Sequence, residues 1–227
     1  MPVSEILLRS GALFPADPGF CRVHPYQESR HQSAPYGTPK RALNLLIAAV
    51  ATRPKAECSV RVATPEDMAA VTSIYAHFVE NTTATFDLVA PGEATMRRRL
   101  QTVAESGLPY LVAELDGYIV GYSYAAIFRP RAGYCFTVED SIYVRADCRG
   151  YGVGKALLTQ LTSLCTLRGC HSMIACICGD NVPSVALHAS LGFLPIGVLP
   201  EAGRKFGKWL SLSIMQRLLA ATAPTNS

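Results

Sequence analysis

The order of strand and helix patterns predicts an α/β fold in which one mixed sheet carries helices on its faces. An opening strand precedes two helices, a run of strands follows, and the chain then alternates helix, strand and helix before two final strands. Nearly half of the 227 residues are apolar (49%), which suits one packed domain with an appendage. A glycine-rich turn between a strand and a helix, at Gly150–Gly154, indicates where that domain holds a ligand.

The first half of the folded part reads as a strand, two helices and two further strands. They are predicted at Val60–Ala63, from Thr64 until Asn81 interrupts the helix, at Glu93–Glu105, at Tyr110–Leu115 and at Tyr118–Ala126. Met68, Val71, Tyr75 and Phe78 recur at helical spacing, so the first helix buries one face. Asp116–Gly117 between two apolar runs is a strong hairpin signal.

The second half begins with a polar loop, Phe128–Tyr134, and contains the remaining strands and helices. They are predicted at Thr137–Val144, at Gly152–Leu167, at Ser172–Cys178, from Asp180 to Gly192, at Phe193–Val198 and at Trp209–Leu218, with Gly203–Lys208 joining the last two strands. No internal repeat is visible, so these elements form a single sheet with helices rather than a solenoid.

Composition separates an N-terminal extension, residues 1–58, from a domain at 59–220 and a C-terminal tail at 221–227. The extension carries seven of the fifteen prolines, and its apolar run Ala42–Ala51 is about ten residues long, whereas a membrane-spanning helix needs ~20. We expect a dispensable extension or a start codon assigned too early. A short helix that docks on the domain and a targeting segment remain alternatives.

Charge and cysteine content exclude several classes of protein. Residues 1–58 hold seven Lys or Arg and four Asp or Glu, a net +3, and residues 59–227 hold fourteen and thirteen, a net +1. A nearly neutral domain argues against a nucleic-acid surface. The eight cysteines include no Cys-x-x-Cys pair and no zinc-type spacing, so we expect no metal and free thiols in a reducing cytoplasm.

The glycine-rich turn predicts a cradle for phosphate. Gly150, Gly152 and Gly154 alternate between the cations Arg149 and Lys155. A backbone that turns into a helix presents unpaired N–H groups, and the helix dipole adds positive potential there. The turn is not a P-loop, because Ala156 follows the lysine where a magnesium-binding Ser or Thr is required. Its glycine spacing also fits a dinucleotide fingerprint poorly.

Two carboxylates stand on the strand before this turn, and either one is a candidate general base. Alternation puts Glu139 on one face with Thr137 and Asp140 on the other with Val138. The pattern does not say which face meets a substrate, so the residues alone leave both carboxylates open. His188 lies on a helix face with leucines, a pattern that favours a core histidine over a functional one.

Four motifs resemble one enzyme family. Arg149-x-x-Gly152-x-Gly154 is similar to the signature of the GNAT acetyltransferases, and Asn181–Phe193 resembles their second motif. T-V-E-D-S-I-Y-V, L-H-x-x-L-G-F, G-R-K-F-G-K-W and E-N-T-T-A-T-F resemble the phosphinothricin acetyltransferase branch, which acetylates the α-amino group of phosphinothricin and of methionine sulfoximine or sulfone. The resemblance runs from about Val60 to Leu218.

The resemblance implies a central, mostly antiparallel sheet with helices on both faces, and acetyl-CoA as co-substrate. It implies that Glu139 is the catalytic carboxylate and that His188 works with it. The residues implied to bind acetyl-CoA are Ile142, Tyr143, Val144, Arg149, Gly150, Tyr151, Gly152, Val153, Gly154, Lys155 and Asn181. The acetyl group is expected to pass directly to the amine, without a covalent intermediate on Cys148.

The small-molecule substrate is expected to carry an acidic group, because guanidinium pairs well with carboxylate or phosphinate. The candidate substrate-binding residues are Arg129, Arg131 and Tyr134 in the loop and Thr137 on the strand. The alternative is that the loop residues are ordinary solvated surface side chains. The resemblance also implies a homodimer, and no partner membrane or nucleic acid is expected. Alternative functions are acetylation of a protein N-terminus or a polyamine, and a non-catalytic CoA-binding module.

Overall fold

A seven-stranded sheet organises residues 58–219, which are the residues that the structure, a computed structural model, describes. The strand order is β1-β2-β3-β4-β5-β7-β6. The predicted N-terminal extension (apart from Cys58) and the predicted C-terminal tail lie outside the described residues. The expectation of a mixed sheet with helices is confirmed.

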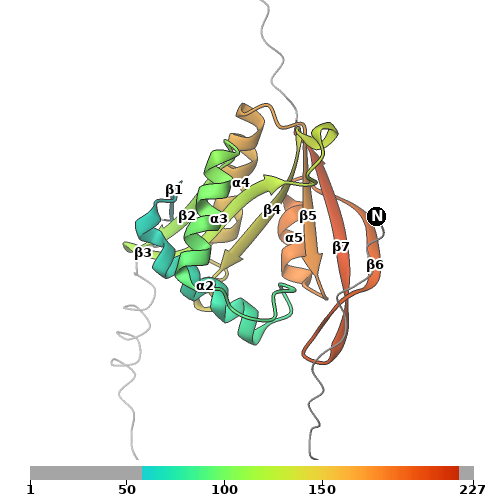
Figure 1. Cartoon of the computed structure of the whole chain (residues 1–227), viewed down its shortest axis with the longest axis horizontal. Helices are drawn as coiled ribbons and strands as arrows, with labels where there is room; N and C mark the ends of the chain where they lie inside the picture. The colour runs from blue at the N-terminus through green and yellow to red at the C-terminus, as the bar shows by residue number, and fades with distance from the viewer. Residues whose placement is uncertain (1–57, 220–227) are drawn as a thin grey trace, which may run out of the picture. The chain divides into compact units, whose positions relative to one another are not determined.

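The strands and helices follow the predicted order (Figure 1). Their bounds are β1 Ser59–Val62, α2 Met68–Asn81, α3 Glu93–Glu105, β2 Tyr110–Leu115, β3 Tyr118–Ile127, β4 Thr137–Val144, α4 Val153–Leu167, β5 Ser172–Cys178, α5 Val182–Ser190, β6 Leu194–Lys205 and β7 Lys208–Leu218. Within residues 58–219, no helix is long and apolar enough to cross a membrane.

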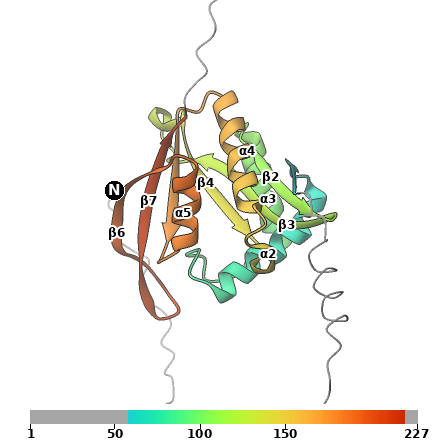
Figure 2. The same ribbon diagram turned by 180° about the vertical axis from the view of Figure 1, so that it is seen from behind.

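Helices cover both faces of the sheet. Figures 1 and 2 show α2 and α3 on one face and α4 and α5 on the other. On the α2 face, the Tyr143 ring of β4 packs edge-on against Tyr75 and Phe78, with ring centroids 5.1 and 5.2 Å away. On the α4 face, fully buried Leu157 and Leu161 belong to the same hydrophobic core as Val138 of β4. The strand β4 is therefore covered on both sides.

The strands β4 and β5 are parallel, whereas every other neighbouring pair in the sheet is antiparallel. They pair only from Thr137–Ser172 to Asp140–Ala175. Beyond Asp140, β4 continues to Val144 beside β3, and β5 continues to Cys178 beside β7. The two strands diverge toward their C-terminal ends (Figure 1). This opens a gap in the middle of the sheet.

The two hairpins test the turn predictions. Asp116 and Gly117 have φ of 51° and 80°, the left-handed pair that a two-residue hairpin turn requires, so that prediction is confirmed. The prediction for the last hairpin was wrong: β6 runs on to Lys205, and only Phe206 and Gly207, with φ of 48° and 74°, form the turn. Because β6 is an exposed edge strand whose register shifts between Leu199 and Gly203, its second part, Leu199–Lys205, lacks the alternating pattern that reveals a strand in sequence.

Candidate active site

The glycine turn has the backbone geometry of an anion cradle. Gly150 and Gly152 both have φ of 82°, a left-handed conformation that favours glycine. Gly152 is the N-cap of α4, so the first N–H groups of that helix point out of the turn. Gly154 allows close packing, because a Cβ there would meet Leu187 Cδ2 of α5 at 3.2 Å. The turn and α5 are thus in direct contact.

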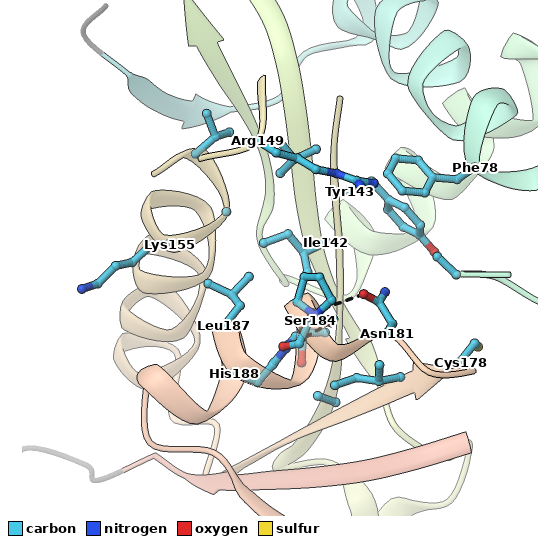
Figure 3. A pocket seen from close by; sticks show the side chains of 18 of the residues that line it. Phe78, Ile142, Tyr143, Arg149, Lys155, Cys178, Asn181, Ser184, Leu187 and His188 are labelled. Atoms are coloured by element: carbon cyan, nitrogen blue, oxygen red, sulfur yellow. Dashed lines mark hydrogen bonds and ion pairs between the residues drawn. The ribbon is translucent and has the colours of Figure 1, made fainter. Parts of the chain in front are cut away.

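A cavity of about 480 Å³ begins at this turn, a size typical of small-molecule sites. Its walls come from α2, β4, the turn, β5 and α5 (Figure 3). The residues that line it are Phe78, Ala84, Asp140, Ile142, Tyr143, Val144, Cys148, Arg149, Gly150, Gly152, Val153, Gly154, Lys155, Ala175, Cys176, Ile177, Cys178, Asn181, Pro183, Ser184, Leu187 and His188.

The cavity extends to both faces of the sheet through the gap between β4 and β5. Tyr143 and Phe78 lie at its α2 side, whereas Leu187 and His188 line it from α5 (Figure 3). In the gap, Ser141–Val144 keep their hydrogen bonds to β3 but have no partner in β5. The backbone groups of this stretch that point toward β5 are therefore free to bind a ligand.

His188 is paired with Asp140, not with Glu139. The His188 Nε2 lies 3.0 Å from Asp140 Oδ2, and its Nδ1 lies 2.7 Å from the Ser184 carbonyl oxygen. Both side chains are only 2% exposed. Burial lowers the pKa of His188, but the hydrogen bond and charge of Asp140, with the Ser184 carbonyl, more than offset it and leave the pKa raised.

Glu139 lies on the α2 face of β4, opposite Asp140. It is half-buried and stands beside the thiol of Cys176, which lines the cavity, although Glu139 itself does not. Burial, followed by the negative charge of Asp140, raises the pKa of Glu139, while Cys176 and the charge of Arg129 act in the other direction. A half-buried carboxylate with a raised pKa is a competent proton acceptor.

The predicted cofactor-binding residues are nearly all gathered in one place. Ile142–Val144, the turn residues and Asn181 line the cavity. The Asn181 side chain also caps α5 by accepting from the Ser184 N–H at 3.3 Å. Tyr151 is the exception, since it is 52% exposed and does not line the cavity. Lys155 is exposed, and its side chain points away from the other labelled residues (Figure 3).

The predicted substrate-binding residues lie outside this cavity. Arg129, Arg131 and Tyr134 are exposed in the loop between β3 and β4. The Arg129 guanidinium lies 4.7 Å from the centre of the Phe128 ring, and Tyr134 packs edge-on against the same ring at 5.8 Å. Thr137 is half-buried and faces the same way as Glu139. Among these four predicted residues, Arg129 is the one whose charge acts on the pKa of Glu139.

Sequence reasoning missed several residues that line the cavity. Among them are Phe78, Cys176, Cys178, Ser184 and Leu187. One local signal was present, because Ser184 and His188 are four residues apart and so share a helix face. Phe78 comes from α2, and Cys176 and Cys178 come from β5; no local pattern connects these two elements to the glycine turn.

Comparisons with known proteins show which family the chain resembles. Residues 60–212 match the acetyltransferase (GNAT) domain family. The chain is 47% identical to the phosphinothricin N-acetyltransferase of Alcaligenes faecalis over 72% of this chain and 84% of that protein. It is 39% identical to the L-methionine sulfoximine/L-methionine sulfone acetyltransferase of Pseudomonas aeruginosa, over 72% and 96%.

Solved structures show the same relationship. A phosphinothricin acetyltransferase from Sinorhizobium meliloti, crystallised in complex with acetyl-CoA, is 43% identical and superposes with a TM-score of 0.71 over 75% of this chain and 94% of that one. The acetyltransferase yncA of Salmonella typhimurium, solved with acetyl-CoA, is 35% identical, with a TM-score of 0.71 over 72% and 95%. The chain therefore belongs to the GNAT family of acetyltransferases.

Proposed function

We propose that the protein is an N-acetyltransferase that moves the acetyl group of acetyl-CoA directly to the α-amino group of a small amino-acid-like compound. Phosphinothricin and methionine sulfoximine or sulfone are the model substrates, because the similar proteins from Alcaligenes faecalis and Pseudomonas aeruginosa are named for them. The observation that carries the proposal is the cavity that joins the glycine turn to the gap between β4 and β5.

The residues present fit acetyl-CoA. The left-handed turn at Gly150 and Gly152 leaves the first N–H groups of α4 free for a pyrophosphate. Ile142–Val144 pair with β3 but not with β5, and their backbone groups on the β5 side suit the amide groups of a pantetheine arm. Asn181, at the start of α5, offers a further polar contact. When bound there, acetyl-CoA supplies a thioester whose acetyl group an amine can take.

Glu139 takes the proton that the amine loses, directly or through a water molecule. Burial and the charge of Asp140 raise its pKa, which makes this carboxylate a stronger base than an ordinary glutamate. Free N–H groups of β4 in the gap stabilise the negative charge that develops on the acyl oxygen. Tyr143, packed between Tyr75 and Phe78, keeps this part of the strand rigid.

The acidic group of the substrate binds to the loop before β4. The charge of Arg129 acts to lower the pKa of Glu139, so its guanidinium is close enough to the proposed base to interact with it electrostatically. Arg131 and Tyr134 follow in the same exposed loop. Arginine is well suited to carboxylate and phosphinate because it donates two parallel hydrogen bonds. An anionic amino compound is therefore favoured over a polyamine.

The assembly is a homodimer in the cytoplasm. The edge strand β6 exposes Leu194, Ile196, Val198 and Leu199, each by half or more. An edge strand with this much exposed apolar surface requires a cover, and a second copy of the chain provides one. All seven cysteines within residues 58–219 are free thiols, which suits a reducing compartment.

A thiol-release assay tests the function. Purified protein and acetyl-CoA are mixed with phosphinothricin, methionine sulfoximine, methionine sulfone, spermidine and an N-terminal peptide. We expect CoA release with the first three and N-acetylated products by mass spectrometry. Acetyl-CoA binding without turnover on any amine supports a CoA-binding module instead, and turnover of spermidine or peptide alone refutes the substrate class.

A further inference from the structure

The structure gives the buried pair of His188 and Asp140 a role different from proton transfer with the substrate. We propose that the two residues share one proton and tie α5 to β4, that this tie holds the acetyl-CoA cavity in shape, and that His188 does not take the proton of the amine. The proposal rests on the acetyl-CoA site proposed above. Both residues line that cavity, and His188 belongs to α5, the helix that forms one of its walls.

The hydrogen bonds of His188 determine where its protons are. Nδ1 lies 2.7 Å from the Ser184 carbonyl oxygen and 3.4 Å from the Ser184 hydroxyl. The much shorter contact is to the carbonyl, which has no proton to give, so Nδ1 carries the proton of that hydrogen bond. Nε2 faces a carboxylate oxygen of Asp140 at 3.0 Å. A single proton must therefore lie between these two atoms. The pair is either an imidazolium with a carboxylate or an imidazole with a carboxylic acid.

Neither state leaves His188 with a nitrogen available to a substrate. In the first state both nitrogens are protonated, and in the second the free pair of Nε2 accepts from Asp140. The ring is also clamped edge-on against Phe193, with centroids 5.0 Å apart. To act as a base, the imidazole would have to leave Asp140, and a buried group separated from its partner is strongly disfavoured.

Asp140 depends equally on His188. Within the described residues, His188 is the sole hydrogen-bond partner of this carboxylate, whose Oδ1 is buried without one. Removing the imidazole therefore leaves a buried carboxylate without a donor. Asp140 is also the last residue of β4 that pairs with β5. The tie thus joins α5 to the strand at the point where the gap opens.

The tie reaches the cofactor site through α5. Asn181, Ser184 and Leu187 of this helix region line the cavity. Leu187 also packs within 3.2 Å of the position that a Cβ on Gly154 would occupy, so a shift of α5 changes its contact with the glycine turn. Breaking the tie should for this reason weaken acetyl-CoA binding more than it slows the chemical step. The two consecutive carboxylates therefore have separate tasks. Glu139 accepts the proton of the amine, and Asp140 holds α5 in position through His188.

The test compares four variants by acetyl-CoA calorimetry and by steady-state kinetics. His188→Ala and Asp140→Ala should each raise the Kd and the KM for acetyl-CoA by about 10-fold. Asp140→Asn should rescue most of this loss, because its amide N–H supplies the one proton that Nε2 needs. His188→Gln should also rescue, because its amide nitrogen donates to Asp140. Exposed Asp116→Asn and His171→Gln are the matched controls and should leave both constants unchanged.

The double variant and the ring protons complete the test. Asp140→Ala with His188→Ala should raise Kd no more than either single change, because one tie is lost only once. In ¹H–¹⁵N spectra of the folded protein, Nδ1 of His188 should stay protonated from pH 6 to 9. The proposal is overturned if the double variant weakens acetyl-CoA binding by the product of the two single effects, or if Nδ1 is unprotonated. It is also overturned if His188→Gln lowers kcat about 100-fold while the Kd for acetyl-CoA stays unchanged. The Kd for acetyl-CoA and the spectra are measured without an amine. A wild type that binds acetyl-CoA but acetylates no amine would therefore refute the proposed substrate and leave the test of the His188–Asp140 pair intact.

Discussion

Replacing Gly152 with alanine tests the cradle through its backbone alone. Gly152 has φ of 82° and is the N-cap of α4, and an added Cβ would meet no atom within 4 Å. The substitution therefore introduces no steric clash. Its effect comes from holding an L-residue in the left-handed region, which costs roughly 1–2 kcal/mol.

The expected magnitude follows from that cost. A difference of about 1.4 kcal/mol changes an equilibrium tenfold, so the binding-competent turn becomes on the order of 5- to 30-fold less populated. The Kd for acetyl-CoA measured by calorimetry should rise by about the same factor. Because the chemical groups are unchanged, kcat at saturating acetyl-CoA should fall much less.

Gly169→Ala is the matched control. Gly169 follows the other end of α4, has φ of 79°, and also has open space around a Cβ. Both variants should lose similar stability in urea unfolding, but only Gly152→Ala should lose acetyl-CoA affinity. Wild-type affinity in Gly152→Ala, with stability lowered as in the control, would refute the assignment of this turn to the cofactor.

Three further predictions concern the proposed base, the loop and the edge strand. Glu139→Gln should lower kcat roughly 10²-fold or more, whereas the exposed control Glu105→Gln should not. A kcat of Glu139→Gln equal to that of the wild type would show that Glu139 is not the base. Because the pKa of Glu139 is raised and a base must be deprotonated, kcat/KM of the wild type should fall as pH drops through a value above 4.5, and Glu139→Gln should lack this limb. Replacing Arg129 and Arg131 together by Gln should raise the KM for an anionic amine about 10- to 100-fold and leave the KM for acetyl-CoA unchanged. If only the KM for acetyl-CoA rose, these arginines would bind the cofactor and not the amine. Ile196→Lys should convert the dimer to a monomer in sedimentation velocity, and a monomeric wild type would contradict the proposed assembly.

Local chemistry made much of the fold predictable. The bounds of β4 and β5 agree with the prediction residue for residue, because each strand is a run of β-favouring residues ended by a turn. The hairpin at Asp116–Gly117 was predictable because few residue pairs accept two left-handed conformations. The last hairpin was not, since β6 is exposed along most of its length and its second part, Leu199–Lys205, carries no apolar alternation.

The sequence by itself determined the glycine turn, the strand before it, and the separation of Glu139 and Asp140 onto opposite faces, because these follow from residue conformation and from the period of a strand. Only the tertiary structure decided which face each carboxylate meets. The alternation of side chains along a strand separates two faces but does not say what covers each face. That depends on α4 and α5 packing together on one side of the sheet. That packing brings His188 to Asp140 across 48 positions in the chain, and leaves Glu139 on the other face, beside Cys176.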